Sequence, residues 1–251
     1  MTGTNLMDSE TAPSDPSAES AAIAFARSLA ASWARDAAGV LGIYLIGSLA
    51  HGGFCRRYSD GDVALILDSR DTAAIEKMRS DAKAASSEFA AKLSLFWTDR
   101  EFSTGRFPLL DRIDYLDHAV PIAERERVIP SRPSLDEVRT CLRGDPFSKW
   151  ARAALHFAGL DALDPADNKH YLRCLLYPAR FAFTWMTGRV ASNDDAVTFL
   201  SGWPPSRELN IAPMEQALEC RRSAGIPETL FAERTSLLQH VEFCERLIAS
   251  G

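Results

Sequence analysis

The chain lacks the closely spaced cysteines and histidines that mark zinc sites. Its five cysteines are odd in number and scattered through 251 residues, so they predict neither a metal cluster nor a disulfide framework. We therefore expect reduced thiols with structural roles. These residues are Cys55, Cys141, Cys174, Cys220 and Cys244.

Long apolar runs are missing as well. No stretch reaches the roughly 18 uninterrupted apolar residues that a membrane span requires. Residues 1–20 are acidic and Ser-rich, contain two prolines and have no basic start, so they do not resemble a signal peptide. We expect a cytoplasmic protein that binds no membrane, and we interpret residues 1–20 as a disordered tail.

Basic charge is not in excess either. The formal net charge is -6, which argues against binding to a nucleic-acid backbone, because such binding needs clustered Lys and Arg. An acidic balance fits neutral or cationic substrates better. The composition, with 46% hydrophobic and 25% charged residues, is ordinary for a globular protein with a sizeable core.

The first half of the chain alternates between helical and strand patterns. Apolar residues at near-helical spacing predict helices, and short continuous apolar runs between turn formers predict buried strands. This alternation favours an α+β or α/β domain over residues 21–130. The expected helices cover 21–38 and 72–91, and the expected strands cover 40–46, 63–67 and 92–97.

The second half, residues 131–251, has a helical pattern and no convincing strand. The composition changes after Pro130 and Pro133, where we place a linker. A last amphipathic helix is expected over residues 229–248. The second half is therefore predicted to be an all-α bundle.

One helix of that bundle has clear boundaries in the sequence. Apolar residues from Leu172 to Met186 recur at three- and four-residue steps, and Gly188 can end the helix. Ser192, followed three residues later by Asp195, predicts the N-cap of the next helix.

A polar loop, residues 47–62, joins two of the expected strands and ends in two aspartates. Side chains two residues apart in a strand point to the same side, so Asp60 and Asp62 should project together. Unpaired, these carboxylates would repel and raise the pKa of one of them, a penalty that a divalent cation removes. Mg²⁺ binds a few carboxylates and fills its other positions with water and phosphate oxygens. The pair therefore predicts a magnesium site beside a nucleotide.

The start of the same loop suits phosphate. Gly47 permits close backbone approach, and Ser48 offers a hydroxyl and an N–H to phosphate oxygens. Taken alone, Gly-Ser is common, and Asp-x-Asp in a loop is often a solvated turn or a cap. The conjunction of buried strand, Gly-Ser, glycine-rich loop, Asp-x-Asp and buried strand favours a nucleotide site.

With Gly-Ser at its start and Asp-x-Asp opening a strand, the loop resembles the signature of the polymerase-β-like nucleotidyltransferase superfamily. It is most similar to the aminoglycoside nucleotidyltransferases. A second stretch, residues 180–196, is similar to the C-terminal helical domain of streptomycin/spectinomycin adenylyltransferases, where an Arg-led helix ends in Thr-Gly before another helix. The resemblance implies an α+β fold, with an N-terminal mixed-sheet nucleotidyltransferase domain, a C-terminal helical bundle and an active site in the cleft between them.

The resemblance also implies a reaction. ATP is the expected donor: a substrate hydroxyl attacks its α-phosphorus and pyrophosphate leaves, with Mg²⁺ ions about 3.5–4 Å apart stabilising the charge. The expected acceptor is a small hydroxylated, cationic molecule such as an aminoglycoside. Asp164 and Asp167 lie near the region that supplies acidic contacts to the aminoglycoside in those enzymes, with helix capping by Asp167 as the alternative.

The sequence departs from the superfamily pattern at the third carboxylate. The superfamily usually adds an acid from a following strand, but the expected strand, KLSLFW, contains none. Asp99, just past its end, is the substitute that we assign as catalytic beside Asp60 and Asp62, with Glu101 and Asp114 behind it. General-base help of this kind typically contributes ~10²–10⁴-fold.

A few further residues are candidates for nucleotide binding. Ser59 precedes the acidic pair, and Arg57 can clamp the triphosphate or be merely solvated. Arg180, on an otherwise apolar helix, can point into the cleft toward phosphates or lay its stem along the helix. His51 either faces a ligand or is an ordinary loop histidine.

Two other functions remain compatible with the sequence. A nucleotidyltransferase of the toxin–antitoxin type would modify a protein or RNA hydroxyl, although its minimal versions lack so large a helical half. A nucleotide-binding module with lapsed catalysis would explain the missing acid.

Overall fold

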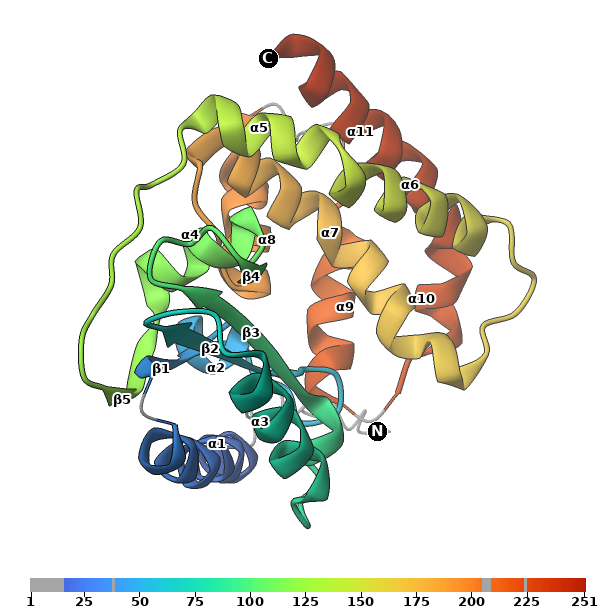
Figure 1. Cartoon of the computed structure of the whole chain (residues 1–251). Coiled ribbons are helices and arrows are strands. Elements are labelled where there is room, and N and C mark those ends of the chain that lie inside the picture. The colour runs from blue at the N-terminus through green and yellow to red at the C-terminus, as the bar shows by residue number, and fades with distance from the viewer. Residues whose placement is uncertain (1–15, 38, 205–208, 224) are drawn as a thin grey trace, which may run out of the picture.

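The computed structural model describes residues 16–37, 39–204, 209–223 and 225–251. Its N-terminal part contains a five-stranded mixed sheet in the order β4-β3-β2-β1-β5 (Figure 1). β2 and β3 are parallel, and the other neighbouring strands are antiparallel. The strands are β1 (Val40–Ile46), β2 (Gly61–Leu67), β3 (Leu93–Asp99), β4 (Gly105–Arg106) and β5 (Val120–Glu124).

Helices cover both faces of this sheet, which is why β1 is buried along its whole length. Alternate side chains of a strand point to opposite faces. Ile43 packs on one face with Trp33 of α1, and Tyr44 packs on the other face with Tyr115 of α4. The helices of this part are α1 (Pro16–Asp36), α2 (Ser48–His51), α3 (Thr72–Ala84) and α4 (Leu109–His118).

The N-terminal elements differ from the expected ones in three respects. α1 begins at Pro16, so residues 16–20 of the expected tail are helical, and residues 1–15 lie outside the described residues. α3 ends at Ala84 instead of 91, because Ala85 is extended and the Ser87 hydroxyl accepts a hydrogen bond from the Phe89 N–H. α2, α4, β4 and β5 were not expected as elements.

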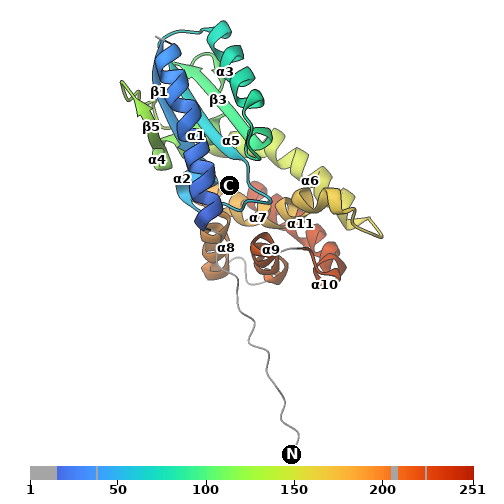
Figure 2. The same cartoon turned by 90° about the horizontal axis from the view of Figure 1, so that it is seen from below.

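The C-terminal part is helical, as expected. α7 is its central helix and is buried through residues such as Tyr171, Leu175 and Phe181. The helices are α5 (Leu135–Arg143), α6 (Asp145–Ala158), α7 (Asn168–Thr187), α8 (Asn193–Gly202), α9 (Ala212–Arg222), α10 (Glu228–Ala232) and α11 (Ser236–Ser250). Figure 2 shows these helices gathered beside one end of the sheet part.

The expected helix signals are confirmed in part. Gly188 has φ +67 and ends α7, and the Ser192 side chain caps α8 by accepting a hydrogen bond from the Asp195 N–H. The expected single helix over 229–248 is instead α10 and α11, separated by a 3-10 turn. Within the described part of the chain, no helix is both long and apolar enough to cross a bilayer.

Candidate active site

The turn after β1 places three groups together. Gly47 has φ +64, and a Cβ added there would collide with Asp62 Oδ2, so the turn needs glycine. The Gly47 N–H donates a hydrogen bond to Asp114 Oδ2 at 2.5 Å. Ser48 then begins α2. The turn is thus held between one carboxylate from β2 and another from α4.

The acidic pair lies at the start of β2. Asp62 is in register with Ile46 at the end of β1 and with Ser94 on β3. Asp60, two residues earlier, forms an ion pair with Lys169 of α7, whose Nζ lies 2.7 Å from Asp60 Oδ1. The sheet therefore brings both carboxylates to the boundary with the helical part.

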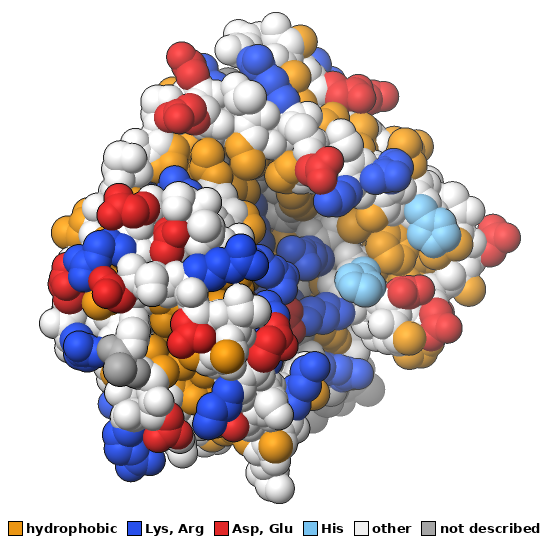
Figure 3. Space-filling model, viewed as in Figure 1, with side chains coloured by type: hydrophobic (Ala, Val, Ile, Leu, Met, Phe, Trp, Pro, Cys, Tyr) orange, Lys and Arg blue, Asp and Glu red, His pale blue; other side chains and the backbone are white. Residues whose placement is uncertain are grey.

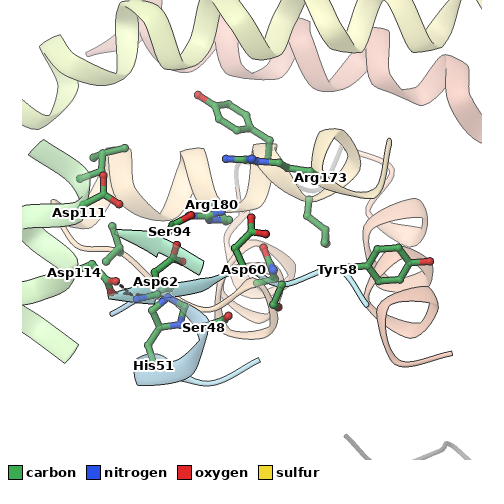
Figure 4. Close-up of a pocket in the computed structure, with 18 of the residues that line it drawn as sticks. Ser48, His51, Tyr58, Asp60, Asp62, Ser94, Asp111, Asp114, Arg173 and Arg180 are labelled. Carbon is green, nitrogen blue, oxygen red and sulfur yellow. Dashed lines mark hydrogen bonds and ion pairs between the residues drawn. The ribbon is translucent and has the colours of Figure 1, made fainter. Parts of the chain in front are cut away.

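A cavity of about 410 Å³ lies at this boundary, lined by residues of both parts. On its sheet side, Asp111 and Asp114 of α4 join the acidic pair (Figure 4). Asp111 and Asp114 are three residues apart on the helix, so they share one face. Four carboxylates therefore share this wall.

These carboxylates interact unfavourably with one another. Burial raises the pKa of Asp62 to about 7, and the charges of Asp60, Asp111 and Asp114 add to the shift, while a hydrogen bond from Ser94 opposes it. Burial, reinforced by Asp114, raises the pKa of Asp111 to about 6. A positive charge placed among these groups would be stabilised.

His51 lies behind the turn and faces the same cavity. Its Nε2 is 3.8 Å from Asp114 Oδ1. Burial lowers the pKa of His51, although Asp114 acts in the opposite direction. His51 therefore lies next to Asp114 in the acidic wall of the cavity.

The opposite wall carries positive charge. Arg173 and Arg180 of α7 line the cavity, as do Lys169 and Arg221. Arg180 is open to the cavity but otherwise enclosed by protein, and this enclosure, together with Arg173, lowers the pKa of its guanidinium. Arg221 donates a hydrogen bond to the Ser59 hydroxyl at 3.1 Å. An acidic wall thus faces a basic one.

Comparison with known proteins identifies this architecture. No family model and no curated protein sequence matches the chain. Among solved structures, it is similar to the spectinomycin adenyltransferase AAD(9) from Enterococcus faecialis, whose structure contains ATP and spectinomycin. The TM-score is 0.57 at 12% sequence identity, and the match covers 90% of this chain and 99% of the other. The chain has an adenylyltransferase fold. The predicted α+β class is confirmed.

In this adenylyltransferase fold, most of the candidate residues from the sequence meet in one cavity. Ser59 lines it, but its hydroxyl is already engaged as an acceptor for the Cys55 N–H and for Arg221. The candidates that line the cavity are Gly47, Ser48, His51, Ser59, Asp60, Asp62, Asp114 and Arg180.

The structure corrects the assignment of Asp99. Asp62 is in register with Ser94, whereas Asp99 lies five residues further along β3, or roughly 16 Å away. Burial alone would raise the pKa of Asp99, but hydrogen bonds from Ser103 and Thr104 outweigh it and lower the pKa to about 2. Asp99 therefore closes a local turn at the far end of the strand.

The assignment of Arg57 to triphosphate binding is also corrected. It is exposed, its guanidinium lies 5.5 Å from the centre of the Tyr58 ring, and it does not line the cavity. Glu101 and the acids Asp164 and Asp167 do not line it either. Asp164 accepts a hydrogen bond from the Ala166 N–H, whereas the Asp167 side chain makes no capping hydrogen bond.

Several residues that line the cavity, Asp111 and Arg173 among them, were not expected from the sequence. Asp111 was missed because α4 was not predicted, although the pattern LLDRIDYLDH places Asp111 and Asp114 on one helical face. Arg173 lies within the predicted helix, and its seven-residue spacing from Arg180 was the available signal. Among the described residues, no group of three or more His, Cys, Asp or Glu side chains is arranged as a metal site.

Proposed function

We propose that this protein is a nucleotidyltransferase that transfers a nucleoside monophosphate, AMP from ATP, to a hydroxyl group of a small molecule. The observation that supports this most strongly is the meeting of Asp60, Asp62 and Arg180 beside a glycine turn, in a chain with an adenylyltransferase fold. The similar structure contains ATP and spectinomycin, which supports a nucleotide and a small acceptor as the two ligands.

We assign the phosphates to the turn and to α7. Ser48 offers its hydroxyl and N–H, whereas the Gly47 N–H already donates to Asp114. Arg180 has no hydrogen-bond or ion-pair partner among the described residues and lies within electrostatic range of Asp114 and His51, beside the turn. A guanidinium group matches phosphate oxygens in geometry and charge.

The residues present fit a magnesium ion. Burial and three neighbouring carboxylates raise the pKa of Asp62. Asp114 is only 6% exposed, and its Oδ1 has no hydrogen-bond partner among the residues that the structure describes. Asp60 and Asp62 would hold the ion. When bound, it would neutralise negative charge on the phosphate oxygens.

We assign the proton of the attacking hydroxyl to Asp111. Ser94 occupies the position opposite Asp62 on β3, and this strand supplies no acid to the cavity lining. Asp111 lines the same cavity, and burial brings its pKa to about 6, close to the value that suits a general base at neutral pH. The acceptor oxygen bonds to the α-phosphorus, the bond from that phosphorus to its bridging oxygen breaks, pyrophosphate leaves, and Asp111 takes the proton.

The proposal is tested by calorimetry with Mg²⁺ and α,β-methylene ATP. The wild-type protein should bind this analogue in a Mg²⁺-dependent manner, and the double variant Asp60→Asn, Asp62→Asn should not. Asp99→Asn, which removes a carboxylate outside the cavity, is the matched control and should bind as wild type. Equal binding by the double variant and the wild type, with both correctly folded, would contradict the proposal.

A nucleotide-binding module without catalysis is the second candidate, favoured by Ser94 in place of an acid on β3. Pyrophosphate release distinguishes the two functions. Mg²⁺-dependent binding of ATP without pyrophosphate release, across neutral, cationic and anionic hydroxylated acceptors, would favour the module.

A further inference from the structure

The helical wall of the cavity carries basic side chains along the length of α7, with Leu176 and Tyr177 between them. Lys169, Arg173 and Arg180 are four and seven residues apart on α7, so they project from one helical face over roughly 16 Å. Figure 3 shows Lys and Arg side chains gathered about the hollow between the two parts. Arg221 of α9 adds to this wall.

The same wall contains no acid among the described residues. The four carboxylates that line the cavity belong to the loop, strand and α4 of the sheet part. Asp164 and Asp167, which directly precede α7, lie outside the lining. A molecule bound against α7 would therefore meet positive groups, and the carboxylate that contacts them, Asp60, is already paired with Lys169.

Phosphoryl transfer places the two substrates on opposite sides of the reacting phosphorus, because the attacking and leaving oxygens lie roughly in line. Ser48 and Arg180, the residues proposed to bind the phosphates, lie on the side of the Gly47 turn. The acceptor then approaches from the other side of the acidic pair, where Asp60 contacts Lys169. Arg173 lies one helical turn after Lys169 and lines the same cavity as Asp60 (Figure 4).

The two cations on this side are available to a ligand. Arg173 has no hydrogen-bond or ion-pair partner among the residues that the structure describes, and it is exposed to the cavity. Lys169 is paired with Asp60. A divalent ion held by Asp60 would take over that carboxylate, which frees the Lys169 ammonium for another anion.

We propose that the acceptor carries an anionic group, a phosphate or a carboxylate, and that Lys169 and Arg173 bind it. This inference rests on the proposed nucleotidyltransferase function and names the class of its second substrate. It replaces the cationic acceptor that the acidic net charge and the family resemblance suggested. The reason is that net charge describes the whole surface, whereas recognition depends on the groups that line one wall.

The test measures acceptor binding to a complex in which the nucleotide site is already filled. The full chain is saturated with Mg²⁺ and α,β-methylene ATP, and four probes are titrated by calorimetry: ribose 5-phosphate, gluconate, inositol and spectinomycin. Ribose 5-phosphate and gluconate both carry hydroxyl groups and one anionic group, which is a phosphate in the first and a carboxylate in the second. Comparing them therefore shows which anion the site prefers. We expect at least one of these two to bind more tightly than inositol and spectinomycin.

Reversing the charge of Arg173 then tests whether this residue binds the anionic group of the probe. Arg173→Glu should weaken the anionic probe about tenfold or more, since hydrogen bonds to charged groups are among the strong ones, while the nucleotide analogue still binds. Arg152→Glu on α6 is the matched control. Arg152 is exposed and does not line the cavity, so its reversal should leave probe binding unchanged.

The outcomes separate this inference from the function on which it rests. If the nucleotide analogue itself does not bind, the proposed function fails. If the analogue binds but neither anionic probe does, or if spectinomycin binds more tightly and Arg173→Glu strengthens it, the anionic acceptor is overturned. Equal loss of the anionic probe in Arg173→Glu and Arg152→Glu would also overturn it.

Discussion

At the scale of single residues, the site is a small volume in which several charges of one sign are held close together. Gly47 has no side chain and a positive φ, so Asp62 can pack against the turn. Asp114 approaches the same turn from the other side and accepts a hydrogen bond from its backbone. This close packing of carboxylates stores electrostatic repulsion that a bound cation would relieve.

Burial of Asp62, together with the repulsion from its neighbours, predicts how this residue affects the stability of the metal-free protein at different pH values. The pKa of Asp62 is raised from 3.8 to about 7 on folding, so the folded state binds this proton more tightly than the unfolded state. The free energy of unfolding should therefore fall as pH rises from about 4 to about 7, with no further loss from this group above that range. The fall from this group is on the order of 4 kcal/mol.

Urea denaturation in EDTA, at several pH values between 4 and 8, measures this effect as a difference between wild type and Asp62→Asn. The variant cannot ionise there, so it should be the more stable of the two at pH 8, and the difference should shrink toward pH 4. A difference that does not change with pH would show that the Asp62 carboxyl is not perturbed by its neighbours.

At the scale of elements, the further carboxylates of the cavity come from α4 and not from β3. The expected strand contained no acid, so Asp99, just past its expected end, was assigned as the third carboxylate, whereas the register of β3 places the Ser94 hydroxyl beside Asp62. α4 was not expected, and it contributes Asp111 and Asp114. The acids on α4 depend on how this helix packs across the sheet, through Tyr115 against Tyr44.

The register of β2 and β3 predicts that an acidic side chain at position 94 would lie beside Asp62 and act with Asp60 and Asp62 in binding a metal ion. Ser94→Asp should raise the affinity for Mn²⁺, measured by electron paramagnetic resonance, because it adds a third carboxylate beside Asp62. It should also lower the stability of the metal-free protein through added repulsion. Ser94→Asn, similar in size but uncharged, is the control and should leave the Mn²⁺ affinity near that of wild type. An unchanged affinity in Ser94→Asp would show that position 94 does not face the ion.

At the scale of the whole molecule, the cavity exists only because the helical part closes over the edge of the sheet. Lys169 and Asp60 are joined across this boundary, and so are Arg221 and Ser59. A ligand bound between the two walls therefore contacts both parts of the chain and should stabilise them together.

Thermal unfolding checks this expectation. Mg²⁺ with α,β-methylene ATP should shift the unfolding of the sheet part and of the helical part together, as a single transition. A ligand at 100 times its Kd would contribute about 2.7 kcal/mol. Two transitions, of which the ligand shifts only one, would mean that it contacts one wall alone. The Asp60→Asn, Asp62→Asn variant should show no shift.

Some features of this protein follow from the sequence by itself. The pair Asp60 and Asp62, the Gly47 turn and the end of α7 at Gly188 were predictable, because each depends on residues close together in the chain. Strand alternation and helical spacing act locally. The division into a sheet-containing half and a helical half was predictable for the same reason.

Only the tertiary structure decided which charges share the cavity. Asp111 and Arg173 meet the acidic pair through the packing of α4 and α7, which are far from residues 60–62 in sequence. The same packing keeps Asp99 and Arg57 away, one at the far end of a strand and one on the surface. Local patterns specify which side chains lie on one face of an element, but the groups facing them come from elements brought close by burial of the core.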